Sequence, residues 1–103
     1  MMNTDALITH ARARFDHATA RRLLKEKYEA KMLFAYNGGM WRAGPELLTL
    51  LQAVPVSDDI VLTDLYDTPV KVNPAELQYL VLGRWQEQMN AWLVEHDEMS
   101  RKR

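Results

Sequence analysis

The chain has no cysteine among its 103 residues. That absence excludes disulfide bonds, thiolate zinc sites and a cysteine nucleophile, and it suits a reducing compartment. No apolar run approaches the ~20 residues of a membrane-spanning helix, and the first residues, MMNTDALITH, lack the basic-then-apolar order of a signal peptide. We therefore expect a soluble protein that is made in the cytoplasm.

The chain also lacks an excess of positive or negative charge. The 13 Lys and Arg residues nearly balance the 14 Asp and Glu residues, for a formal net charge of −1. Proteins that coat nucleic acid are normally basic, so this balance argues against that class. The distribution is nevertheless uneven: residues 1–32 carry seven basic and four acidic side chains, and residues 33–74 carry two basic and five acidic ones. A basic start and an acidic middle can orient a protein partner.

Sequence motifs for catalysis and cofactor binding are also lacking. There is no nucleophile and base at a recognised spacing, no phosphate-binding loop and no dinucleotide fingerprint. Of the three histidines, His10 and His17 lie two helical turns apart, which is wider than the spacing that brings two ligands of one helix to a metal. We therefore predict a protein that is not an enzyme and that binds no metal and no cofactor.

Four aspartates give the middle of the chain its acidity: Asp58, Asp59, Asp64 and Asp67. A carboxylate pair among them could hold a divalent cation or act as acid and base. Turns and strand edges explain every one of these positions, and we prefer that interpretation.

Two long stretches predict helices at the ends of the chain. Residues 4–30 contain no glycine or proline, and their apolar spacing allows either one bent helix or two shorter ones. Residues 74–100 form the clearest helix, because Asn73 can cap it and Pro74 suits its first turn. Glu76 completes the capping-box spacing. If it runs to Met99, this helix has roughly 26 residues, or about 39 Å, and is longer than so small a domain needs.

Residues 31–73 predict two β-hairpins with a short helix between them. Asn37-Gly38 is the strongest hairpin signal, because both turn positions need a positive φ. Pro45 suits the first position of the short helix, and Asp67 belongs to the turn of the second hairpin. The chain as a whole therefore predicts an α+β fold in a single domain, residues 1–103. We expect the hairpins to form one small antiparallel sheet, and the terminal helices to project or to pair, within one chain or between chains.

Candidate partner-binding residues form two groups. Three tryptophans exceed what a minimal core needs, and tryptophan frequently anchors interfaces. Two of them share one face of the C-terminal helix, while the third, in the first hairpin, faces either the core or a partner. The N-terminal helix carries a basic stripe, which is either a solvated face or a contact for an acidic protein surface or for phosphates. The predicted partner-binding residues are Trp41, Trp85, Met89, Trp92, Arg14 and Arg21.

Three stretches, FAYNGGMWRAGPELL, IVLTDLYDTPVKVN and RWQEQMNAW, together resemble small uncharacterised proteins of T-even-type contractile-tailed phages, myoviruses that include cyanophages. The resemblance covers about residues 24–99. The family carries no catalytic residues to transfer, and Gly44 stands where its members often have a threonine or a similar helix cap. The resemblance implies a phage protein that is a minor component of the virion or of its assembly.

Three hypotheses about function follow from these observations. The first is a non-enzymatic phage protein-binding component, a minor structural or assembly protein of the tail, baseplate or neck. Its partners would be other phage structural proteins or a second copy of itself. It would act in the host cytoplasm during assembly, and the structural form of this hypothesis also places it in the virion. The second is a regulatory binder or inhibitor of a host or phage polymerase or nuclease that uses the acidic middle as a nucleic-acid mimic. The third, nucleic-acid binding through the basic stripe, is disfavoured by the near-neutral charge.

Overall fold

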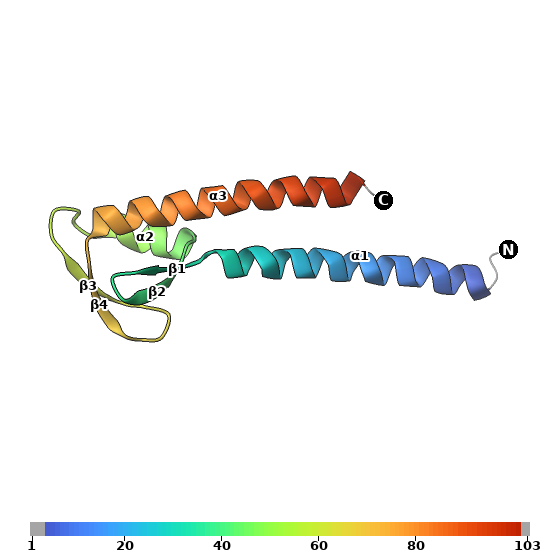
Figure 1. Cartoon of the computed structure of the whole chain (residues 1–103), viewed down its shortest axis with the longest axis horizontal. Helices are drawn as coiled ribbons and strands as arrows, with labels where there is room; N and C mark the ends of the chain where they lie inside the picture. Colours follow the sequence, from blue (N-terminus) through green and yellow to red (C-terminus); the bar gives the residue numbers. More distant parts are fainter. Residues whose placement is uncertain (1–3, 102–103) are drawn as a thin grey trace.

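The structure, a computed structural model, describes residues 4–101. The chain consists of two long helices joined by two hairpins and a short helix (Figure 1). The elements are α1 (Thr4–Lys31), β1 (Leu33–Tyr36), β2 (Gly39–Arg42), α2 (Pro45–Ala53), β3 (Ile60–Thr63), β4 (Pro69–Val72) and α3 (Pro74–Arg101). This order confirms the predicted α+β fold class. The N-terminal helix, for which two alternatives were open, is one continuous helix.

The two hairpins form two separate two-stranded sheets, where we expected a single sheet. The first hairpin turns at Asn37 and Gly38, whose φ angles of 50° and 82° are both positive, as the Asn-Gly signal predicts. The two hairpins contact each other where the turn after β3 lies against β2; strand β3 itself does not pair with β2. A backbone hydrogen bond of 2.9 Å from Leu65 N to Met40 O joins them there. Because the contact is made by a turn, no continuous ladder forms between the sheets.

The start of α3 follows its sequence signal. Asn73 Oδ1 accepts a hydrogen bond of 3.0 Å from Glu76 N, which satisfies one of the free amides at the helix start. The start of α2 differs, because Gly44 precedes Pro45 without a side-chain cap. Proline has no amide hydrogen, so one of the free amides of the helix start is absent, and glycine in place of a capping side chain costs only a few tenths of a kcal/mol.

The hydrophobic core lies at one end of the molecule. Apart from Tyr28, every buried hydrophobic residue of the described chain lies between Met32 and Val81. Leu51 of α2 and Leu77 of α3 have no exposed surface where these two helices pack against each other. We call residues 32–81 the head.

The molecule as a whole is elongated. It measures 70 × 25 × 20 Å, with a Cα radius of gyration of 19.9 Å, whereas a compact chain of this length would have about 13 Å. In Figure 1, α1 and α3 leave the head side by side, and the N-terminal part of α1 extends beyond the end of α3. We call residues 4–22 the arm; within it only His17, Thr19 and Ala20 are half-buried, and the others are exposed. The terminal helices therefore pair within the chain near the head, and α1 then projects.

Candidate protein-binding groove

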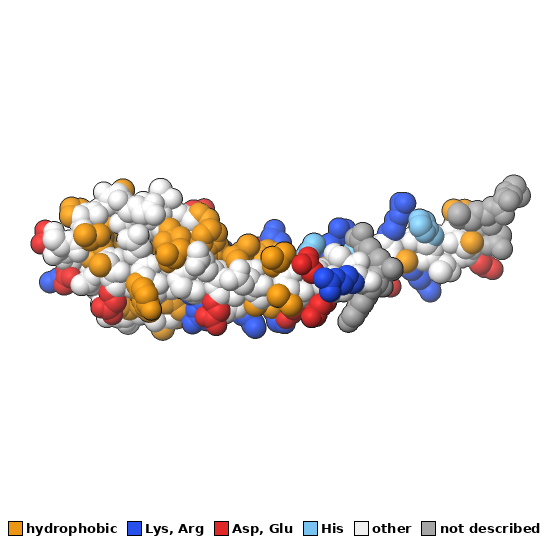
Figure 2. All heavy atoms as spheres, turned by 90° about the horizontal axis from the view of Figure 1, so that it is seen from above, with side chains coloured by type: hydrophobic (Ala, Val, Ile, Leu, Met, Phe, Trp, Pro, Cys, Tyr) orange, Lys and Arg blue, Asp and Glu red, His pale blue; other side chains and the backbone are white. Residues whose placement is uncertain are grey.

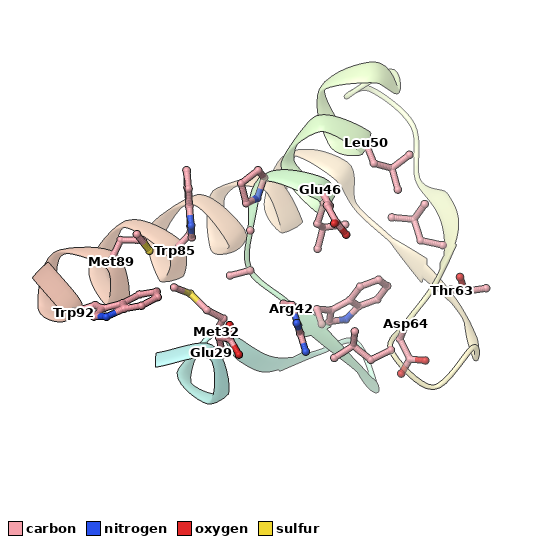
Figure 3. A pocket seen from close by; sticks show the side chains of 17 residues that line it. Glu29, Met32, Arg42, Glu46, Leu50, Thr63, Asp64, Trp85, Met89 and Trp92 are labelled. Atoms are coloured by element: carbon pink, nitrogen blue, oxygen red, sulfur yellow. The ribbon is translucent and has the colours of Figure 1, made fainter. Parts of the chain in front are cut away.

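A groove of about 700 Å³ lies between α3, the last turn of α1, α2 and the loop after β3. Figure 3 shows Trp85, Met89 and Trp92 of α3 along one wall, with Met32 facing them from the end of α1. Aliphatic side chains of the head, among them Leu50, line the other wall. The site is therefore a largely apolar trough with one aromatic helical wall.

Four of the six predicted partner-binding residues line this groove, although they differ in exposure. Trp85 is half-buried and packs against the core, and Met89 is 39% exposed. Trp41 is only 3% exposed, and its Nε1 donates a hydrogen bond of 2.9 Å to Tyr36 O. The alternative left open for Trp41 is thus decided in favour of the core, and this residue can offer a partner only the small part of its surface that faces the groove.

Next to the groove, α1 and α3 contact each other directly. The rings of Tyr28 and Trp92 stack with centroids 6.0 Å apart and planes 6° from parallel. The Tyr28 hydroxyl donates a hydrogen bond of 2.7 Å to Glu95 Oε1, and Lys27 Nζ donates one of 2.7 Å to the same oxygen. We call Lys27, Tyr28 and Glu95 the clamp, because together they hold the two long helices at a fixed separation beside the groove.

The clamp changes the proton affinity of all three of its members. The hydrogen bonds from Lys27 and then Tyr28 lower the pKa of Glu95 below its ordinary value. The hydrogen bond to Glu95 is also the main cause that raises the pKa of Lys27 and that of Tyr28. At neutral pH the clamp therefore contains a carboxylate, an ammonium group and a neutral phenol.

Asp64 holds the two hairpins together at the far wall of the groove. Its Oδ2 accepts a hydrogen bond of 3.0 Å from Met40 N, and its Oδ1 accepts bonds from Tyr66 N at 2.9 Å and Thr68 N at 3.0 Å. These backbone donors, Met40 and Thr68 first, lower the pKa of Asp64 and keep its carboxylate charged. The turn explanation preferred for this residue agrees with these contacts.

The rim of the groove carries more negative than positive charge. Three acidic residues and one basic residue line it, for a formal charge of −2: Glu29, Glu46, Asp64 and Arg42. Glu29 also lies 3.7 Å from Lys25 Nζ on its own helix. Sequence reasoning identified the acidic middle of the chain but not Glu29, which belongs to the basic N-terminal segment and reaches the groove only through the fold.

The remaining predicted residues, Arg14 and Arg21, are exposed and lie in the arm, away from the groove of their own chain. Figure 2 shows the broad head at one end and the narrow arm at the other, where basic side chains lie beside hydrophobic ones. The structure thus separates the two predicted groups onto two surfaces, the groove and the arm.

Within residues 4–101, no group of three or more histidine, aspartate or glutamate side chains is arranged to hold a metal ion. No helix in the same part of the chain is both long enough and apolar enough to cross a membrane. Comparison of the whole chain with family models, curated proteins and solved structures finds no match. The chemistry of the groove and the arm is therefore the basis on which function is inferred.

Proposed function

We propose that this protein is a non-enzymatic, protein-binding component of a contractile-tailed phage, a minor structural or assembly protein of the tail, baseplate or neck. The groove carries the proposal, because two tryptophans and a methionine stand together there on one helical wall. Tryptophan is a frequent interface anchor, and methionine adapts its shape to an incoming surface. The phage setting is supported by the resemblance of the three sequence stretches.

A helix is the ligand that fits such a groove best. Amphipathic helices commonly bind by laying an apolar face into a hydrophobic trough. The wall formed by Trp85, Met89 and Trp92 follows the axis of α3 over about two turns, so it offers a docking helix a parallel surface. The acidic rim around it favours a partner with basic flanks.

The proposal is tested by mass spectrometry of purified particles from infected cells, combined with capture of assembly proteins on the purified chain. We expect the protein in particles at a fixed stoichiometry, or in a defined complex with a structural protein. Met89→Lys places a charge in the groove and should abolish incorporation or capture.

The matched control is Val94→Lys, at a residue that is 57% exposed on the same helix but does not line the groove. Five residues further along, its side chain points about 140° away from that of Met89. A protein that is absent from particles and that captures no structural protein overturns the proposal. A salt-sensitive complex with a polymerase or nuclease would overturn it in favour of the regulatory alternative.

A further inference from the structure

The arm presents an apolar seam that no described part of its own chain covers. Phe15 is 71% exposed and Ile8 50% exposed. The seam consists of Ile8, Ala11, Phe15 and Ala18. Its alternating three- and four-residue spacing is that of a helix that packs along another surface. Side chains of this size gain stability only when a partner covers them.

The arm and the groove carry opposite charge. Residues 4–22 contain four arginines and two aspartates, for a formal charge of +2. The residues that line the groove have a formal charge of −2, of which the exposed Glu29, Glu46 and Arg42 account for −1 and the buried Asp64 for the rest. An arm that lies in the groove would therefore bring apolar surface to apolar surface and basic flanks to an acidic rim.

The seam and the groove also open toward the same side of α1. Ile8, Phe15, Arg22 and Glu29 follow one another at intervals of seven residues. Residues at this spacing form a line that drifts by about 20° per heptad, which adds up to about 40° between Phe15 and Glu29. Because Glu29 lines the groove, the seam lies along the continuation of the groove on the same face.

We infer that the groove receives the arm of a second copy of this chain, and that the two copies exchange arms reciprocally in an antiparallel dimer with two-fold symmetry. The inference deepens the proposed function, on which it rests, by naming a second copy as the partner of the groove. Because each copy would give its arm and receive the other's, the contact would be isologous and would close the dimer.

The charges near the centre of α1 determine the register. Arg22 Nε and Glu26 Oε1 lie 3.9 Å apart on the exposed face of one chain. A two-fold axis midway between these residues sets Arg22 of each copy opposite Glu26 of the other. The same axis sets Phe15 level with residue 33 of the other copy, beside Met32 in the groove. The seam and the ion pair thus specify one register.

Analytical ultracentrifugation of the full chain over a range of concentrations tests the dimer. We expect a monomer–dimer equilibrium, and we expect Phe15→Asp to raise the dissociation constant by more than about tenfold, which corresponds to ~1.4 kcal/mol. Ala13→Asp is the matched control, because Ala13 is exposed on the same helix but lies about 160° around the axis from Phe15, on the face opposite the seam. Circular dichroism verifies that each variant keeps its helices.

A mixing experiment tests the register. Arg22→Glu and Glu26→Arg each place like charges across the two-fold axis, so each variant alone should be monomeric. An equimolar mixture places opposite charges at both contacts and should form a heterodimer.

Three results would overturn the inference. They are a wild-type chain that stays monomeric up to about 1 mM, a dimer that Phe15→Asp leaves intact, and a mixture that stays monomeric. A monomer that still enters phage particles leaves the proposed function standing, so the two failures are distinguishable.

Discussion

In the head, Leu77 and Val81 have no exposed surface, whereas in the arm Phe15 keeps 71% and Leu7 53% of theirs exposed. Both sets lie on long helices and recur at helical spacing. The difference is in what surrounds them: α2 and the hairpins pack over the first part of α3, while no described element lies over the seam of the arm. An apolar stripe thus reveals that a helix face needs cover, but not whether the same chain supplies it.

This difference separates stability from recognition. The head buries its apolar residues against one another, so it supplies the free energy that keeps the chain folded. In proteins most helical stability comes from the tertiary packing of an apolar face, and within residues 4–101 the apolar face of the arm is exposed. The arm therefore depends on the continuity of α1 with the clamp, and its apolar side chains remain available for a partner.

The largest expected effects come from removing core side chains of the head. Leu77→Ala should lower the free energy of unfolding by about 2–5 kcal/mol, because it deletes buried methyl groups and leaves a cavity. Urea unfolding measures this change. Leu93→Ala on the same helix, where the side chain is 59% exposed, should change it by less than about 0.5 kcal/mol. Equal losses for the two variants would contradict the contrast between covered and uncovered faces.

A smaller effect is expected from a methyl group added where the two hairpins meet. In Gly39→Ala the new Cβ would lie 3.1 Å from Asp64 Cβ and 3.1 Å from Val70 Cγ2. Such overpacking should destabilise the head by about 1–3 kcal/mol. Gly83→Ala is the control in the interior of α3, where the new Cβ meets nothing within 4 Å; it should stabilise the chain by about 0.5–1 kcal/mol. Thermal unfolding shows whether the two melting temperatures shift in opposite directions.

We expect the contact that the clamp makes between α1 and α3 to depend on pH. The pKa of Glu95 is lowered in the fold, so the contribution of the clamp is fully present above the unfolded pKa of about 4.3 and is lost as the pH falls through the lower value. Glu95→Gln should remove this dependence, whereas Glu87→Gln, at an exposed residue of the same helix, should preserve it. NMR signals of the Tyr28 and Trp92 rings report the transition. Ring signals of the wild-type protein that are unchanged down to pH 2 would contradict the clamp.

The order and bounds of the elements were predictable, because their signals are local. Residues 4–30 and 74–100 were expected to be helical, and the helices span Thr4–Lys31 and Pro74–Arg101. A turn such as Asn37-Gly38 depends on two adjacent residues, and the cap at Asn73 depends on four. Such signals can be read without knowledge of the rest of the fold.

The candidate site was only partly predictable, because its geometry depends on residues far apart in the sequence. The aromatic face of α3 was visible in the spacing of Trp85 and Trp92. The contact between Tyr28 and Glu95 joins residues 67 positions apart, and the bond from Met40 N to Asp64 crosses 24 positions. No local pattern marks either contact, and for the same reason the separation of the two sheets was not foreseen.

The smallest expected effect on stability is that of Phe15→Ala in the arm. It is best measured beside Phe34→Ala in the head, because these are the two phenylalanines of the chain. Phe34→Ala removes a side chain that is 8% exposed in the head, and it should cost about 3–5 kcal/mol. Phe15→Ala removes one that is 71% exposed in the arm, and in dilute solution it should change the free energy of unfolding by less than about 0.5 kcal/mol. A large loss from Phe15→Ala in dilute solution would show that the arm packs against its own head.

Protein concentration sharpens this last comparison. If the arm binds a second copy, association stabilises the native state by mass action, and raising the concentration increases the wild-type melting temperature. Phe15→Ala should remove most of that increase, because it removes the largest side chain of the seam. Phe34→Ala should lower the melting temperature at every concentration, because it acts within one chain. The concentration at which the effect of Phe15→Ala emerges then measures how strongly a partner covers the arm.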